Sequence, residues 1–226
     1  MFCVVSVVLL HSMTFLHKVI PNYGIAIILI TIAIKIIFWP LTAKQMKSMK
    51  DMQKFQPLMA KIKEKYKDDQ ARQQQEMMKL YKEHKINPMG GCLPMLVQIP
   101  VFFGLFAMLR SAIQLRGAGF LWISDLSQPD TIFHLAGLAV NPLPIVMTAA
   151  MLWQQQITPT TGDAQQAKMM KFMPLMMLFF FYNASSGLAL YWTVQQFLSI
   201  AQQWYTMRKT ETTGTVTVIP PSGKKK

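Results

Sequence analysis

The sequence is short of the residues that build most catalytic and metal sites. It has two cysteines in 226 residues, Cys3 and Cys92, and their wide separation fits neither a disulfide framework nor a set of metal ligands. HExxH, GxSxG and glycine-rich phosphate-loop motifs are also missing. We therefore expect no catalytic residues, no cofactor and no metal, and we do not expect an enzyme. Charged residues make up only 15% of the chain, which is too few for a soluble domain of this length.

Apolar residues are abundant instead. Hydrophobic residues account for 52% of the chain, with 19 Met and 14 Phe, a composition that predicts several membrane spans. Two of the apolar runs are shorter than the roughly 20 residues that cross a bilayer, so polar neighbours such as Gln154 to Gln156 must belong to the helices. We predict an all-α membrane protein with five transmembrane helices, over residues 22–40, 92–116, 143–158, 171–183 and 187–206.

The first 21 residues form a further apolar stretch. His11, His17 and Lys18 interrupt it and Pro21 ends it. No small-residue cleavage site follows, so an amphipathic helix lying in the membrane interface is preferred over a signal peptide. We predict this interfacial helix over residues 1–21.

The segments between the predicted spans differ in charge. The stretch from Thr42 to Lys85 carries twelve Lys and Arg against six Asp and Glu, whereas residues 117–142 contain two Asp and no Lys or Arg. The positive-inside rule then places the hairpin (41–88), the short loop (159–170) and the basic tail (207–226) in the cytoplasm, and the loop 117–142 outside. Within the hairpin, apolar residues at helical spacing predict two helices that break around Lys67 to Asp69. The predicted protein has its N-terminus outside and its C-terminus in the cytoplasm.

Lys35 lies in the first predicted span, among eight Ile, Leu29 and Phe38. A lysine near a helix centre costs roughly 2.5–3.5 kcal/mol on insertion scales, so an ionisable residue in a span indicates a functional site. The alternative is that Lys35, five positions before Pro40, extends its ammonium to the headgroups. Position alone leaves both readings open.

Several motifs, in order, resemble the YidC/Oxa/Alb family of membrane protein insertases over about residues 15–208. They are Pro40-Leu-Thr-Ala-Lys-Gln45 through Phe55-Gln56-Pro57, Gln75-Glu-Met-Met78, Asn87-Pro88-Met-Gly90-Gly91-Cys92-Leu-Pro94, Gln98-Ile-Pro100, Thr158-Pro159-Thr160-Thr161, Phe172-Met-Pro174 and Ser186-Gly187-Leu188-Ala-Leu-Tyr191.

The resemblance implies a multi-pass protein of the bacterial inner membrane. Its five-helix core would surround a hydrophilic groove that opens to the cytoplasm and to lipid and is closed on the outer side. Such a groove would receive nascent membrane proteins and release them sideways into the lipid bilayer. The groove residues expected here are Lys35, Thr31, Gln98, Gln155, Tyr191, Trp192 and Gln195, with Gln196 a further candidate. An apolar sliding surface is expected from Met95, Phe102, Phe103, Met173, Met176 and Phe180, since Met and Phe accept varied partners.

Each of these residues also has an ordinary explanation. A single glutamine usually makes an interhelical hydrogen bond, and a single Met or Phe usually faces lipid or packs in a core. The basic tail would favour ribosomal RNA or anionic lipid, since both are polyanions. The partners expected beyond the substrate are therefore the ribosome, through the tail, and the Sec translocon and signal recognition particle receptor, through the hairpin.

The chain departs from the family pattern in three places. Bacterial members usually carry arginine where Lys35 stands, and lysine keeps the charge but loses the planar fork that grips a carboxylate. Trp192 replaces a common second tyrosine. Gram-negative members also have a large extracytoplasmic domain and an extra N-terminal span, so the chain is either a short form or a fragment.

Two other functional classes compete with an insertase. Buried charge also marks the path of a small-solute channel or transporter, but the sequence shows no internal repeat of the transporter kind and a transporter gives no reason for the basic hairpin. A purely structural scaffold would leave Lys35 unexplained.

Overall fold

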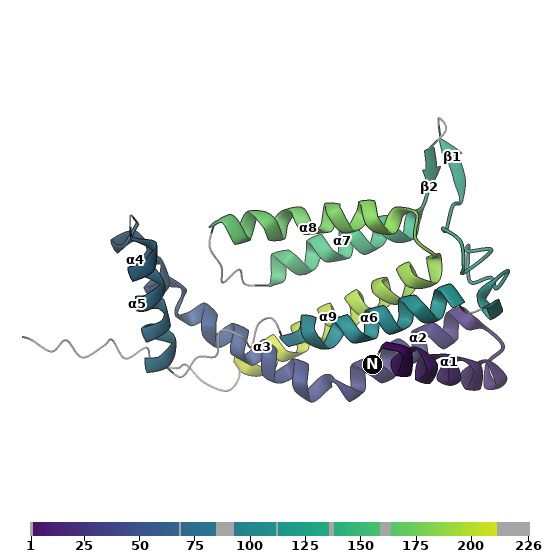
Figure 1. Cartoon of the computed structure of the whole chain (residues 1–226), viewed down its shortest axis with the longest axis horizontal. Helices are drawn as coiled ribbons and strands as arrows, with labels where there is room; N and C mark the ends of the chain where they lie inside the picture. Colours follow the sequence, from purple (N-terminus) through teal and green to yellow (C-terminus); the bar gives the residue numbers. More distant parts are fainter. Residues whose placement is uncertain are drawn as a thin grey trace, which may run out of the picture.

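The computed structural model describes residues 2–67, 69–84, 93–111, 113–135, 138–158 and 164–211. Most of them are helical (Figure 1), which confirms the prediction of a helical protein. The elements are α1 (Phe2–Val19), α2 (Tyr23–Ile37), α3 (Trp39–Lys54), α4 (Gln56–Lys65), α5 (Gln70–Glu83), α6 (Leu93–Ser111), the 3-10 turn η2 (Ile113–Leu115), β1 (Phe133–Leu135), β2 (Leu138–Val140), α7 (Pro142–Ile157), α8 (Ala164–Tyr182) and α9 (Ser186–Glu211).

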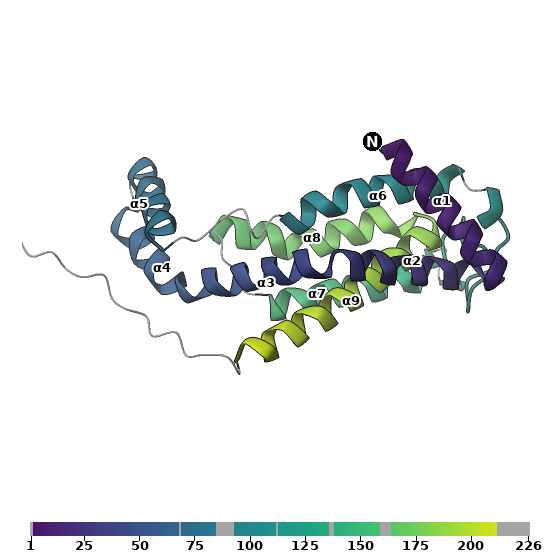
Figure 2. The ribbon, with the colours of Figure 1, turned by 90° about the horizontal axis from the view of Figure 1, so that it is seen from below.

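Helix α9 lies at the centre of the bundle. It packs against α7 on one side and α2 on the other, while α8 packs on the outer side of α7 and α1 packs on α6 and α2 (Figures 1 and 2). The core between these helices is apolar and includes Ile27, Leu105, Met147, Phe181 and Tyr191, each at most 2% exposed.

Local sequence explains where several helices begin and end. The Asn22 side chain accepts a hydrogen bond from the Ile25 amide (3.1 Å), and the Asp69 carboxylate accepts one from the Arg72 amide (2.9 Å). Helices α2 and α5 therefore each start at a capping residue. Pro40 falls in the first turn of α3, where its missing N–H costs nothing.

Helices α2 and α3 follow each other with a sharp bend. α2 ends at Ile37, and the direction of the chain changes by 61° before α3 continues from Trp39. Among the described residues, no single helix has both the length and the apolar composition of a membrane span, and this bent pair meets those criteria only when its two helices are taken together.

The structure departs from the predicted segments in four places. The described part of the hairpin contains three helices where two were predicted, because α3 runs from Trp39 to Lys54 before the chain turns at Phe55. α8 begins at Ala164, inside the predicted 159–170 loop, and α9 continues to Glu211, inside the predicted tail. The predicted loop 117–142 holds an antiparallel pair of strands in which Phe133 lies opposite Val140.

The two ends of the bundle are built differently. The α4–α5 pair stands beyond the end of the bundle at which α9 finishes, and β1 and β2 stand beyond the other end (Figure 1). At the strand end, Leu115 and Leu126 are fully buried, and the Gly187 amide donates to the Leu126 carbonyl at 2.9 Å. The loop is therefore fixed against the start of α9.

Candidate functional site

Six helices meet around a cavity of about 390 Å³, which we call the Lys35 cavity. It is lined by Lys35 of α2, Gln45 of α3, Gln98 of α6, Met151 of α7 and Met173 of α8 together with a row of α9 side chains. The α9 residues are Trp192, Gln195, Gln196 and Ser199. Segments far apart in the sequence thus supply one mixed polar and apolar surface.

Lys35 is a buried cation in this cavity. It is 7% exposed, and its Nζ donates to Ser199 Oγ at 2.8 Å. Ser199 Oγ in turn donates to the Gln195 carbonyl at 2.7 Å. Within the part of the chain that the structure describes, no carboxylate forms an ion pair with Lys35. Among the described residues, the Lys35 ammonium therefore has a hydroxyl partner and no carboxylate partner, and it faces the cavity.

A second set of polar side chains crosses the cavity wall. Gln98 Nε2 donates to the Tyr191 hydroxyl at 2.6 Å, and Gln195 Nε2 donates to Gln98 Oε1 at 3.2 Å. Tyr191 itself is buried behind this wall, at 1% exposed. Trp192 stands edge-on to Phe102, with ring centroids 5.4 Å apart. The structure thus brings together Lys35, Gln98, Tyr191, Trp192 and Gln195.

Two of the expected groove residues lie elsewhere. The Thr31 hydroxyl is fully buried and donates to the Ile27 carbonyl of its own helix at 2.7 Å. Gln155 Nε2 donates to the Met170 carbonyl at 2.5 Å and so joins α7 to α8. Neither residue lines the Lys35 cavity. Gln196, the further candidate, does line it and donates to Gln154 Oε1.

The predicted sliding surface divides into two parts. Phe102 and Met173 line the Lys35 cavity. Phe103, Met176 and Phe180 are exposed instead. The exposed apolar residues of α8 form a larger group, Met169, Phe172, Met173, Leu175, Met176, Phe179 and Phe180, of which Phe179 is 86% exposed. Met95 belongs to α6, but its side chain lies outside the described part of the structure.

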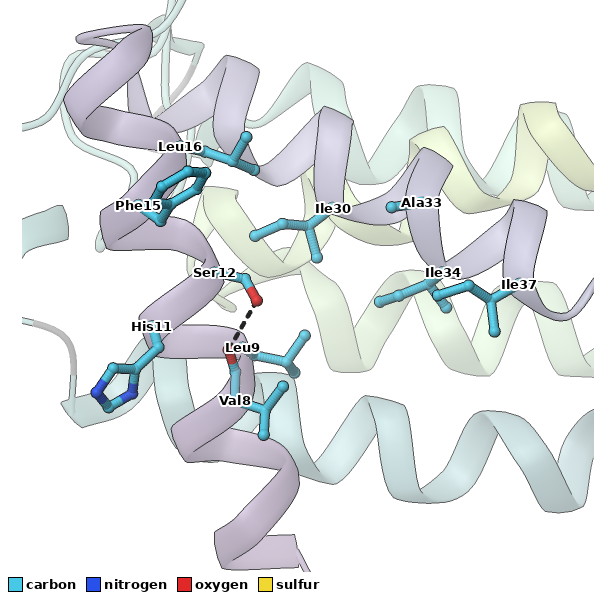
Figure 3. Close-up of a pocket in the computed structure, with 10 residues that line it drawn as sticks. All are labelled: Val8, Leu9, His11, Ser12, Phe15, Leu16, Ile30, Ala33, Ile34 and Ile37. Carbon is cyan, nitrogen blue, oxygen red and sulfur yellow. Dashed lines mark hydrogen bonds between the residues drawn. The ribbon is translucent and has the colours of Figure 1, made fainter.

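A separate cavity of about 580 Å³ lies between α1 and α2 (Figure 3). Its lining is apolar apart from His11, which points away in this view, and Ser12. The Ser12 hydroxyl donates to the Val8 carbonyl at 2.9 Å, so it is already satisfied. Among the described residues, no group of three or more His, Cys, Asp or Glu side chains is arranged to hold a metal ion.

Comparison with known proteins identifies the family. The family model described as "60Kd inner membrane protein" matches residues 15–213. This match covers most of the chain, including every helix that contributes to the Lys35 cavity. The chain belongs to the 60Kd inner membrane protein family.

Individual relatives agree with the family model. The chain is 52% identical over 208 residues to a protein of Pelobacter propionicus named "Membrane protein insertase YidC", matching 90% of this chain and 38% of the relative. It is 54% identical over 198 residues to a protein of the same name from Syntrophus aciditrophicus, matching 87% of this chain and 35% of the relative.

A solved structure supports the same fold. The crystal structure described as "Active YidC insertase crystal structure with the first transmembrane domain resolved" has a TM-score of 0.71 and 31% sequence identity, covering 90% of this chain and 46% of that chain. The chain spans less than half of the length of the relatives that it matches. Like the rest of its family, it is a protein of the inner membrane.

Sequence reasoning missed several polar residues in or beside the Lys35 cavity. Ser199 and Gln202 could have been found, because Tyr191, Gln195, Ser199 and Gln202 recur at helical spacing along α9. Gln202 is buried and donates to Thr42 Oγ1 of α3 at 2.6 Å. Gln45 gave no such signal, since one more glutamine in a polar helix is unremarkable, yet it is 3% exposed.

Proposed function

We propose that this chain is the membrane-embedded core of a membrane protein insertase. It receives nascent membrane proteins in the Lys35 cavity and releases them laterally into the bilayer. The relatives named insertases support this proposal, together with the matching fold. The reaction breaks no covalent bond, so the work of the site is solvation and guidance of the substrate.

The single observation that carries the proposal is the buried ammonium of Lys35, which forms no ion pair with a carboxylate among the described residues. Removing a charge from water is costly unless another charge or polar groups solvate it. Here the Ser199 hydroxyl accepts a hydrogen bond from the Lys35 ammonium. A substrate carboxylate entering the cavity would gain an opposite charge in a medium of low dielectric constant. The site is therefore suited to segments whose Asp or Glu must cross the membrane.

The exposed apolar row of α8 supports a lateral route. Met173 belongs both to the wall of the Lys35 cavity and to this row. A hydrophobic segment that leaves the cavity at Met173 would meet Met176 and then Phe180 along the same helix. Flexible thioethers and aromatic rings suit a surface that must accept many different segments.

We also propose that the α4–α5 end of the bundle faces the cytoplasm. The helices α3–α5 carry the basic stretch, while the strand end carries Asp125 and Asp130. A polyanion such as ribosomal RNA would be attracted to the basic end, and the tail 212–226 that would extend this charge lies outside the described residues. The Sec translocon and the signal recognition particle receptor are further candidate partners of α4 and α5.

Substitution of Lys35 tests the proposed function. Lys35→Arg should retain insertion of a substrate with an acidic extracytoplasmic tail, while Lys35→Met should reduce it about tenfold or more and Lys35→Glu should abolish it, because Met removes the charge and Glu repels the carboxylate. A substrate with a neutral tail should change much less. Protease protection of both substrates in cells depleted of the native insertase measures the effect.

Lys171→Met is the matched control, since it removes one lysine from an exposed position of α8. Equal insertion of the acidic-tail substrate by the wild type and Lys35→Met, at matched expression, would rule out the charge mechanism.

A further inference from the structure

A third cavity, of about 420 Å³, lies at the opposite end of the bundle from α4 and α5. We call it the Arg116 cavity. Its walls come from the last turns of α6 and α8, the α8–α9 connection (183–185), the first turn of α9 and the loop that precedes β1. Unlike the α1–α2 cavity, it combines two kinds of surface. The apolar part includes Phe106, Leu109 and Phe180, and the polar part includes Arg116, Gln128, Asn183 and Ser185.

The polar part is a ready set of hydrogen-bond donors. Within the described residues, the side chains of Arg116, Gln128, Asn183 and Ser185 form no hydrogen bond. A guanidinium offers five N–H donors and the two amides offer more. The first amides of α9 do not add to them, because Ser186 N donates to the Gln128 carbonyl (2.8 Å) and Gly187 N to the Leu126 carbonyl (2.9 Å).

The charged side chain that lines the cavity is basic. Among the described residues, Arg116 lines it and no Asp or Glu does. Asp125 is nearby, but its Oδ1 already accepts two hydrogen bonds from Ser127, from the amide (2.8 Å) and from the hydroxyl (2.7 Å). Partial burial opposes ionisation of Asp125, yet the hydrogen bonds from Ser127 and Gly117 and the charge of Arg116 hold its pKa below the ordinary value. Asp125 is thus ionised and held by the loop.

The polar wall is held in place. The Ser186 hydroxyl donates to the Asp125 carbonyl at 3.0 Å, and the Leu126 amide donates to the Ala118 carbonyl at 3.0 Å. A site fixed in this way does not need to order a loop before binding, which lowers the entropic cost of association.

We propose that the Arg116 cavity binds one anionic phospholipid, with its phosphate at Arg116 and an acyl chain against Phe106, Leu109 and Phe180. Three features point to an amphiphile rather than a small ion. The donors lie on the loop side, the apolar residues lie on the helix side, and Phe180 continues into the exposed apolar row of α8. Guanidinium and phosphate pair in a bidentate geometry, and the hydrocarbon would cover apolar surface. This inference does not depend on whether the chain inserts proteins.

Native mass spectrometry of the full chain tests the proposal directly. The protein in mild detergent is equilibrated with an equimolar mixture of phosphatidylglycerol and phosphatidylcholine, and the retained lipids are counted. The wild type should retain phosphatidylglycerol preferentially. Arg116→Gln should lower that preference about tenfold, the factor that loss of one charge-assisted hydrogen bond predicts. Arg116→Lys should keep most of it.

Two controls separate the possible sources of the anion. Lys171→Gln, which removes an exposed charge near the other end of α8, should leave the preference unchanged. Inorganic phosphate should not displace phosphatidylglycerol, since it cannot cover the apolar wall. Equal retention of the two lipids by the wild type, an unchanged preference in Arg116→Gln, or full displacement by inorganic phosphate would each overturn the proposal.

Discussion

The Lys35 cavity and the Arg116 cavity each contain a basic side chain, but the two charges are handled in opposite ways. Lys35 is almost fully buried and is held by Ser199, whereas Arg116 is exposed and lies beside the loop that holds Asp125. Burial strengthens an interaction with an incoming carboxylate because little water screens it. Exposure leaves Arg116 open to screening by salt. The same formal charge thus suits transient capture in one place and headgroup binding in the other.

The proposal that the α4–α5 end faces the cytoplasm would place the Arg116 cavity toward the opposite side of the membrane, and labelling tests that orientation most sharply. In a background with Cys3→Ser and Cys92→Ser, Ile132→Cys in the strand-end loop should react with an impermeant thiol reagent added to intact cells. Gln74→Cys in α5 should react only after the membrane is opened. Both positions are exposed, so accessibility is not limiting. Reaction of both cysteines from the same side would break the comparison.

A smaller effect is expected from a larger side chain at Gly187. Such a change should disturb the Arg116 cavity more than the Lys35 cavity. A Cβ at Gly187 would lie 3.1 Å from the Leu126 carbonyl oxygen and 3.4 Å from a Leu109 methyl group. Gly187→Val should therefore cost about 1–3 kcal/mol by overpacking and should weaken lipid retention more than Lys35-dependent insertion. Thermal unfolding in detergent measures the first effect.

Ala201→Val provides the control for Gly187→Val, because it adds a branched side chain on an exposed position of the same helix. It should change the free energy of unfolding by less than about 0.5 kcal/mol. Equal stability of the two variants would mean that the loop yields to the added methyl groups.

The smallest effect is expected in the polar wall of the Lys35 cavity. Tyr191→Phe removes the acceptor of the Gln98 amide and should cost about 1 kcal/mol, the typical net value of such a bond. Adding Gln98→Leu to Tyr191→Phe should cost less than the two single changes summed, because the orphaned amide is then gone. Tyr205→Phe on exposed Tyr205 of α9 is the matched control, and additive costs would show that the pair is not coupled.

The helices of the bundle could be predicted from the sequence because each of them contains an apolar run. Gln154 to Gln156 were correctly included in α7, since a helix of bilayer length needed them. The start of α8 was missed because Gln165, Gln166 and Lys168 read as a polar loop, although a helix can extend beyond the membrane with any composition. The strands Phe133–Leu135 and Leu138–Val140 were missed because three residues are too few to show an alternating pattern.

The Lys35 cavity could be predicted only in part. Lys35 was conspicuous because a charge in an apolar run is rare, but its partner Ser199 lies 164 residues away, and a single sequence contains no information on that pairing. Thr31 shares a helix face with Lys35 and still turns inward to its own backbone. Gln155 is polar for the ordinary reason that two helices need a hydrogen bond between them.

The bend between α2 and α3 makes α3, α4 and α5 a lever whose pivot lies beside the buried charge. Lys35 precedes the bend by one turn, and α3 extends from it for 16 residues, or about 24 Å at 1.5 Å per residue. A rotation of about 10° at Phe38 would therefore move the far end of a rod of that length by about 4 Å. Thr42 and Gln45 line the cavity from the first turns of α3, and Gln202 donates a hydrogen bond to Thr42. A displacement of α4 and α5 would thus move the wall of the Lys35 cavity by a smaller distance.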